Sequence, residues 1–226
     1  MVIVFIGVKN MLTCKVDLRS LDDSNLECGL CKKCTGNSKL DYPFHRDLLN
    51  SDDLVVELMR YISAKTGYFC RKTTIDKYPD INVYRDSAYD ELLCRIEAKL
   101  LEGQAFMKAR ERLGLYAKET LVVDEPKLDS YLCCKEEDRK KGREIPIYVV
   151  WKFDKPCDDV GGITVFQEID ELQRLRRLYG YARAFRRRTG AYDYQNGIRM
   201  GVVDKYHFSI RECEPIENLV SVMCQI

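Results

Sequence analysis

Three charged residues in the stretch from Tyr78 to Lys99 could do chemistry together. They are Asp80, Glu97 and Lys99, and a charged side chain on a half-buried strand costs free energy unless a partner compensates it. Two carboxylates with room for water suit a hard divalent ion such as Mg²⁺ or Mn²⁺. Such an ion activates a bound water for attack on a phosphodiester, and a nearby lysine adds positive charge. The alternative is a solvated strand face that carries an ordinary Glu-Lys pair.

A β-hairpin would bring these side chains together. Residues 87–90 carry a small residue and an Asp between two extended runs, which predicts the turn. In an antiparallel pairing centred on that turn, Asp80 lies directly opposite Glu97. Side chains alternate along a strand, so Glu97 and Lys99 share one face while Ala98 points to the other. Opposed positions have Cβ atoms roughly 4.5–5.5 Å apart, which allows two carboxylates to bind one ion.

Pro79-Asp80 on one strand and the E-A-K triplet at 97–99 on the next resemble the PD-(D/E)xK signature of the restriction-endonuclease-like nuclease superfamily. The resemblance implies a helix, a mixed sheet of about four strands and a further helix over roughly residues 52–166. It also implies cleavage of nucleic acid that depends on a divalent metal. The Gln and Tyr pair of RecB-like members is not evident, so we do not assign the chain to that branch.

The resemblance also implies a role for each site residue. Asp80 and Glu97 bind the Mg²⁺ or Mn²⁺ ion, and Lys99 orients or activates the attacking water. Glu57, on the preceding helix, is the position that could assist, although a solvated helix residue explains it equally well. Gln104 lies where some family members carry a polar residue that positions the nucleophile or the phosphate.

The N-terminal cysteines form a second candidate metal site. Cys28, Cys31 and Cys34 follow C-x₂-C-x₂-C spacing, and Cys14 is the nearest fourth ligand. Cys70 and His45 are the other candidates for that fourth ligand. Four such ligands would hold a structural zinc ion or an iron–sulfur cluster. The alternative is a set of free thiols in a reducing compartment, because the chain has 11 cysteines, an odd number.

A basic segment near the C-terminus is the candidate nucleic-acid contact. Its arginines are Arg174, Arg176, Arg177, Arg183, Arg186, Arg187 and Arg188. Guanidinium groups bind phosphates in forked geometry, so this local cluster can hold a nucleic-acid backbone. The alternative is a solvated amphipathic helix whose arginines pair with Glu168, Asp170 and Glu171.

Composition limits the class of protein. The 226 residues are 46% hydrophobic and carry a net charge of only +1, so the chain is not a uniformly basic nucleic-acid coat. The apolar residues 1–8 are too short to span a bilayer and predict a first strand of a cytoplasmic protein without a membrane partner. We expect a cysteine-bearing segment over residues 1–50 and a nuclease-like core over residues 51–226.

The elements that position the site follow from hydrophobic periodicity. We expect a helix capped by Ser51 or Asp52 and ended by Gly67, and later helices over 126–143 and 168–188. The run Ile145–Phe153 is apolar apart from Lys152, which is typical of a central strand buried on both faces. Other strands are expected at 121–123, at 163–166 and near the C-terminus. The predicted class is α/β or α+β, a mixed sheet flanked by helices.

Two functions are therefore predicted. The first is a divalent-metal-dependent nuclease that hydrolyses phosphodiester bonds, with DNA as the expected substrate. A homodimer would suit it if it cuts both strands of a duplex. The second is a non-catalytic nucleic-acid-binding or scaffold protein of the same fold, organised by a structural zinc site.

Overall fold

The computed structural model describes residues 12–28, 44–75, 77–102, 106–154, 157, 159–188, 194–195, 198–199 and 202–226. The strand expected at residues 1–8 lies outside these ranges. Within them, no helix is both long and apolar enough to cross a lipid bilayer.

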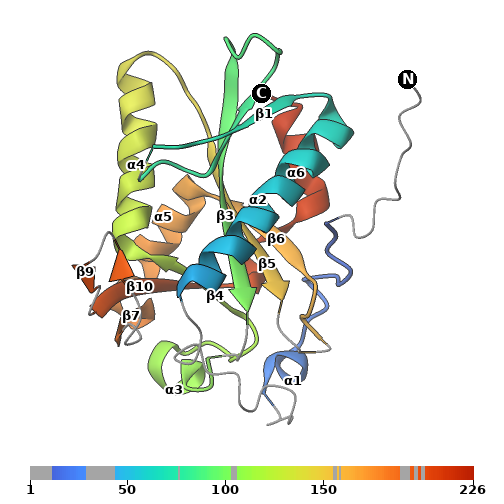
Figure 1. The fold of residues 1–226 in the computed structure, drawn as a ribbon. Helices are drawn as coiled ribbons and strands as arrows, with labels where there is room; N and C mark the ends of the chain where they lie inside the picture. Colours follow the sequence, from blue (N-terminus) through green and yellow to red (C-terminus); the bar gives the residue numbers. More distant parts are fainter. Residues whose placement is uncertain are drawn as a thin grey trace.

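A six-stranded mixed sheet forms the centre of the fold (Figure 1). Its spatial order is β1 (Phe69–Lys72), β2 (Ile81–Tyr84), β3 (Leu92–Glu102), β5 (Ile147–Asp154), β6 (Thr164–Glu168) and β11 (Glu214–Pro215). Strands β3 and β5 pair in parallel, whereas the other neighbours are antiparallel. Strand β5 is buried from Ile147 to Trp151, so the prediction of a central strand from its continuous apolar run is confirmed.

Helices cover both faces of this sheet. Helices α2 (Phe44–Thr66) and α6 (Ile216–Met223) cover one face and pack on residues such as Ile96 of β3. Helices α4 (Glu125–Lys140) and α5 (Ile169–Tyr179) cover the other face, where Trp151 of β5 is fully buried. The predicted mixed sheet flanked by helices is therefore present, with an apolar layer on each side of it.

A second sheet lies beside the first and contains β4 (Thr120–Asp124), β10 (Val202–Ser209) and β7 (Ala184–Arg188) in that order. The short strands β8 (Tyr194–Gln195) and β9 (Ile198–Arg199) form a separate pair. Smaller helical elements connect the larger ones. They are α1 (Asp23–Leu26), α3 (Ala109–Leu113), η3 (Gly180–Arg183) and η4 (Ile210–Glu212). Strand β4 leads directly into α4, and Lys127 in the first turn of that helix lies near Glu97 of β3.

The start of α2 differs from the prediction. The helix begins at Phe44, so Ser51 and Asp52 lie inside it, and Asp52 pairs with Lys72 of β1 at 2.8 Å instead of capping the helix. The expected boundary between residues 50 and 51 therefore falls within one continuous helix. Residues before it also share the core, because Leu18, Leu21 and Leu26 are buried with the main apolar cluster.

The helix expected over residues 168–188 is wrong beyond Tyr179. Helix α5 ends there, and Gly180 follows with φ +49° and ψ −135°, a backbone conformation that residues other than glycine rarely adopt. The chain then forms η3 and enters β7, which pairs with β10. The arginines of this segment are consequently distributed over a helix, a 3₁₀ turn and a strand.

Candidate active site

The hairpin register brings Asp80 and Glu97 together as predicted. Ile81 pairs with Ile96 and Asn82 pairs with Arg95, so the next position outward places Asp80 opposite Glu97. Asp80 Oδ2 accepts a hydrogen bond from the backbone N–H of Ala98 at 2.9 Å. Its backbone carbonyl accepts another from the N–H of Thr73 at 2.8 Å. These two bonds hold Asp80 beside the strand that carries Glu97.

The carboxylate of Glu97 is fully buried. Neither of its oxygens accepts a hydrogen bond from a backbone N–H within the described residues, so its charge depends on neighbouring side chains. Two ammonium groups supply compensating charge: Lys99 Nζ lies 2.5 Å from Glu97 Oε1, and Lys127 Nζ lies 3.6 Å from the same atom. The hydroxyl of Tyr131, also fully buried, lies beside this carboxylate, whose charge raises the pKa of the tyrosine and is itself stabilised by the hydroxyl.

The electrostatics of the pair are asymmetric. Burial and the charge of Glu97 raise the pKa of Asp80 from 3.8 to about 6. Burial alone would raise the pKa of Glu97, but the charges of Lys99 and Lys127 outweigh it and lower that pKa. Burial opposes the charged form of Lys99, yet the carboxylates of Glu97, Asp124 and Asp80 raise its pKa. Lys99 is therefore an ammonium ion at neutral pH, and its charge is shared among these three carboxylates.

Side-chain alternation on β3 explains why these groups meet. Glu97 and Lys99 point toward α4, whereas Ile96 and Ala98 belong to the apolar layer under α2. Lys127 and Tyr131 are one helical turn apart on α4 and so reach the same carboxylate.

Sequence reasoning missed three residues of this site, namely Asp124, Lys127 and Tyr131. Asp124 ends β4 just before α4; its ion pair with Lys205 lowers its pKa although burial opposes this. The only sequence signal for Lys127 and Tyr131 was their spacing of four residues on a predicted helix, which places them on one face. It did not indicate which face of that helix would meet the hairpin.

Glu57 is not brought to the carboxylate pair. It lies on α2 and pairs with Lys152 Nζ at 2.6 Å. Lys152 follows Trp151 on β5 and points to the opposite face, the face that α2 covers. No cluster of three acidic or metal-ligating side chains forms anywhere in the described part of the chain. Gln104 lies outside the described residues.

The four-cysteine site remains a prediction. Cys31 and Cys34 lie outside the described residues, as does the side chain of His45. Cys14 and Cys28 are described, and both thiols are free and partly buried. Cys14 Sγ donates to the carbonyl of Val16 at 3.3 Å, and burial raises the pKa of this thiol.

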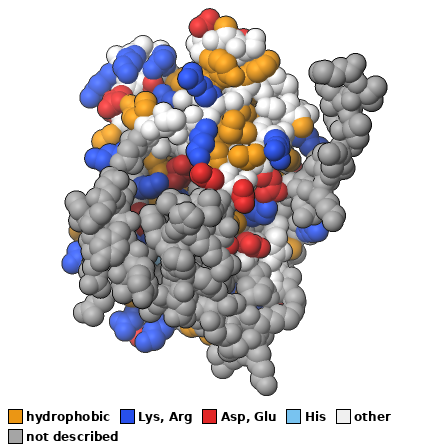
Figure 2. Space-filling model, in the orientation of Figure 1, with side chains coloured by type: hydrophobic (Ala, Val, Ile, Leu, Met, Phe, Trp, Pro, Cys, Tyr) orange, Lys and Arg blue, Asp and Glu red, His pale blue; other side chains and the backbone are white. Residues whose placement is uncertain are grey.

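The arginines expected to bind nucleic acid are mostly paired with carboxylates. Arg174 pairs with Glu171 at 2.6 Å, Arg183 with Glu212 at 2.7 Å and Arg186 with Asp204 at 2.7 Å. Arg177 is exposed, and the side chain of Arg187 lies outside the described residues. The face drawn in Figure 2 likewise mixes acidic and basic side chains and is not uniformly basic. Among these described pairs, only Arg174 pairs with one of the acidic residues expected for a solvated helix, and Arg183 is buried. The role of these arginines in binding nucleic acid stays a prediction.

Comparison with known proteins finds similarity only at the level of structure. No protein-family model matches this sequence, and no curated protein matches it. The 1.6 Å structure of Hjc from Archaeoglobus fulgidus, a Holliday junction resolvase, has a TM-score of 0.39 at 9% identity. That similarity covers 76% of this chain and 96% of Hjc. D212, a nuclease from a fusselovirus, has a TM-score of 0.41 at 12% identity, with coverage of 79% and 89%. At these values the likeness carries no inference about activity, which must come from the site itself.

Proposed function

We propose that this protein is a divalent-metal-dependent nuclease that hydrolyses phosphodiester bonds, with DNA as its expected substrate. The observation that carries the proposal is the fully buried carboxylate of Glu97, in an ion pair with Lys99 and opposite the carboxyl of Asp80, whose pKa is raised to about 6. Placing two carboxylates together at a buried strand end destabilises the fold unless a cation joins them. Clustered groups with perturbed pKa values are typical of functional sites.

The donor set fits Mg²⁺ or Mn²⁺ better than zinc. Asp80 and Glu97 provide hard oxygen ligands, and no histidine or cysteine joins them within the described residues. Magnesium ions in phosphoryl-transfer sites are commonly held by one or two carboxylates, with substrate and water oxygens completing the shell. When bound between Asp80 and Glu97, the metal would lower the pKa of a water molecule and neutralise charge that develops on the phosphate.

The protein's own groups have separable roles. The backbone N–H of Ala98 fixes the carboxylate of Asp80 by donating to Oδ2. The Oδ1 atom is then free to bind the ion without a change of rotamer. Lys99 is protonated, so it acts by orienting the attacking water and stabilising negative charge rather than by removing a proton. The side chain of Lys127 is 45% exposed. When a metal ion binds Glu97, Lys127 can leave that carboxylate and contact a phosphate.

The competing function, a protein of this fold that binds nucleic acid without cutting it, is supported by the same lysines. Lys99 and Lys127 already neutralise Glu97, so the site tolerates a resting state without a metal ion. On that reading, Mg²⁺ changes neither binding nor stability, and affinity depends steeply on salt.

The deciding experiment combines metal binding with cleavage. Mn²⁺ is titrated calorimetrically into the wild type, Glu97→Gln and the control Glu91→Gln, an exposed glutamate at the end of the same hairpin. Labelled single- and double-stranded DNA and RNA are then incubated with each protein in Mg²⁺, Mn²⁺ or EDTA. We expect one Mn²⁺ site and metal-dependent cleavage in the wild type and the control, and neither in Glu97→Gln. Cleavage at the wild-type rate by Asp80→Ala or Lys99→Ala would overturn the assignment.

A further inference from the structure

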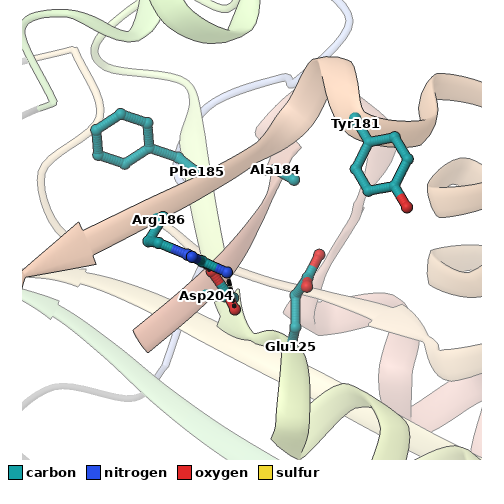
Figure 3. A pocket seen from close by; sticks show the side chains of 6 residues that line it. All are labelled: Glu125, Tyr181, Ala184, Phe185, Arg186 and Asp204. Carbon is teal, nitrogen blue, oxygen red and sulfur yellow. Dashed lines mark hydrogen bonds and ion pairs between the residues drawn. The ribbon is translucent and has the colours of Figure 1, made fainter. Parts of the chain in front are cut away.

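A pocket of about 390 Å³ lies beside the start of α4, on the edge of the second sheet (Figure 3). Its lining residues are Glu125, Tyr181, Ala184, Phe185, Arg186 and Asp204. Tyr181, Glu125 and the Arg186–Asp204 pair converge on the opening, while the ring of Phe185 points away from it. The volume lies in the range of small-molecule sites, about 300–1,000 Å³. None of these residues takes part in the carboxylate site.

The chemistry of the lining favours a flat ring with hydrogen-bond donors. The side chain of Tyr181 is 95% exposed, an unusual position for an aromatic ring that contacts little of its own chain. Glu125 and Asp204 bring two carboxylates against the single guanidinium of Arg186, which holds Asp204 through Nε–Oδ1 at 2.7 Å and Nη2–Oδ2 at 3.3 Å. This excess of acid rejects a phosphate group but accepts amino and imino protons of a nucleobase, and aromatic faces stack on bases.

The pocket is also placed correctly for a substrate of the carboxylate site. Glu125 begins α4 and Lys127 lies two residues later, where its Nζ is 3.6 Å from Glu97. Residues two apart lie on opposite sides of a helix whose diameter with side chains is about 10–12 Å. The pocket and the carboxylate site therefore flank the same helix start, and a strand that joins them passes the positive N-terminal end of α4.

We propose that this pocket is a subsite for an unpaired nucleobase of the strand that is cut at Asp80 and Glu97. The inference rests on the proposed nuclease function. The base stacks on Tyr181, with its amino group facing Glu125 and its acceptor edge facing Arg186. Guanine satisfies both edges best, because it presents an amino and an imino donor on one side and two acceptors on the other. A base within an intact duplex is stacked and paired, so the subsite selects single strands, flaps or distorted junctions.

Binding is measured first without cleavage. The full-length wild type, Tyr181→Ala, Tyr181→Phe and the control Tyr89→Ala are titrated in EDTA with fluorescent single-stranded thymidine oligonucleotides that contain guanine. Tyr89 is the control because it is another exposed tyrosine, 40% exposed in the hairpin turn, and does not line the pocket. We expect Tyr181→Ala to weaken binding by about 5- to 100-fold, the range of one base–aromatic stack, while Tyr181→Phe and Tyr89→Ala bind as the wild type does. Wild-type affinity in Tyr181→Ala would overturn the proposal, as would an equal loss on blunt duplex.

The edge contact is tested by replacing guanine with inosine, which lacks the exocyclic amino group. We expect the wild type to bind the guanine oligonucleotide several-fold more tightly, and Glu125→Gln to lose most of that preference. An unchanged preference in Glu125→Gln would refute the edge assignment. Cleavage in Mg²⁺ is assayed in parallel and judges the nuclease function separately. If the wild type cuts nothing, the nuclease function is refuted. If the wild type cuts normally and Tyr181→Ala does not change binding, only the subsite is refuted.

Discussion

Replacing Asp80 by Asn should stabilise the metal-free protein at alkaline pH. The folded-state pKa of Asp80 is about 6, against 3.8 for the unconstrained side chain. The folded state therefore holds this proton more tightly, and the stability that Asp80 contributes is complete below pH 4 and is lost as pH rises through 6. A shift of about two units corresponds to about 3 kcal/mol as an upper limit, because Asp80 is partly solvated. Asn removes the charge but keeps an acceptor for the N–H of Ala98.

The assay is urea denaturation in EDTA at pH 8 and at pH 4, with Asp90→Asn in the exposed turn as the control. We expect Asp80→Asn to exceed the wild type by about 1–3 kcal/mol at pH 8 and to match it at pH 4. Adding Mn²⁺ should reverse the order, because only the wild type gains binding energy, about 4.1 kcal/mol at a thousandfold excess over Kd. An Asp80→Asn protein less stable than the wild type at pH 8 without metal would refute the reasoning.

Three further predictions concern the lysines and the tyrosine around Glu97. Lys99→Met should abolish cleavage and cost about 3 kcal/mol of stability by leaving a buried charge underpaired, and the double variant with Glu97→Gln should recover most of that stability in urea melts. Lys127→Ala should lower kcat about 10-fold with an unchanged melting temperature, since its side chain is 45% exposed; a wild-type kcat would remove Lys127 from the site. Tyr131→Phe should weaken Mn²⁺ binding about 10-fold in calorimetry by loosening the orientation of Glu97, and an unchanged Kd would leave Tyr131 a packing residue.

The sequence was sufficient for the parts of the fold that local patterns specify. The pairing of Asp80 with Glu97 followed from one turn and the two-residue alternation of strands, and the observed register confirms it. The central position of β5 followed from its apolar run, which is buried from Ile147 to Trp151. Two helix ends were predicted wrongly. Helix α2 begins at Phe44, because residues that often cap helices, such as Ser51 and Asp52, can also lie within one. Helix α5 ends at Tyr179, because Gly180 stops it although the amphipathic pattern continues.

The sequence by itself determined the two carboxylates, the lysine beside them and the hairpin that joins them, since all three depend on contacts between near neighbours in the chain. Only the tertiary structure decided which side chains complete the site. Lys127 and Tyr131 meet Glu97 because α4 packs on one face of the sheet, and Glu57 is excluded because α2 packs on the other. Helical periodicity shows which residues share a face but not which neighbour that face will meet, because packing against distant parts of the chain decides it.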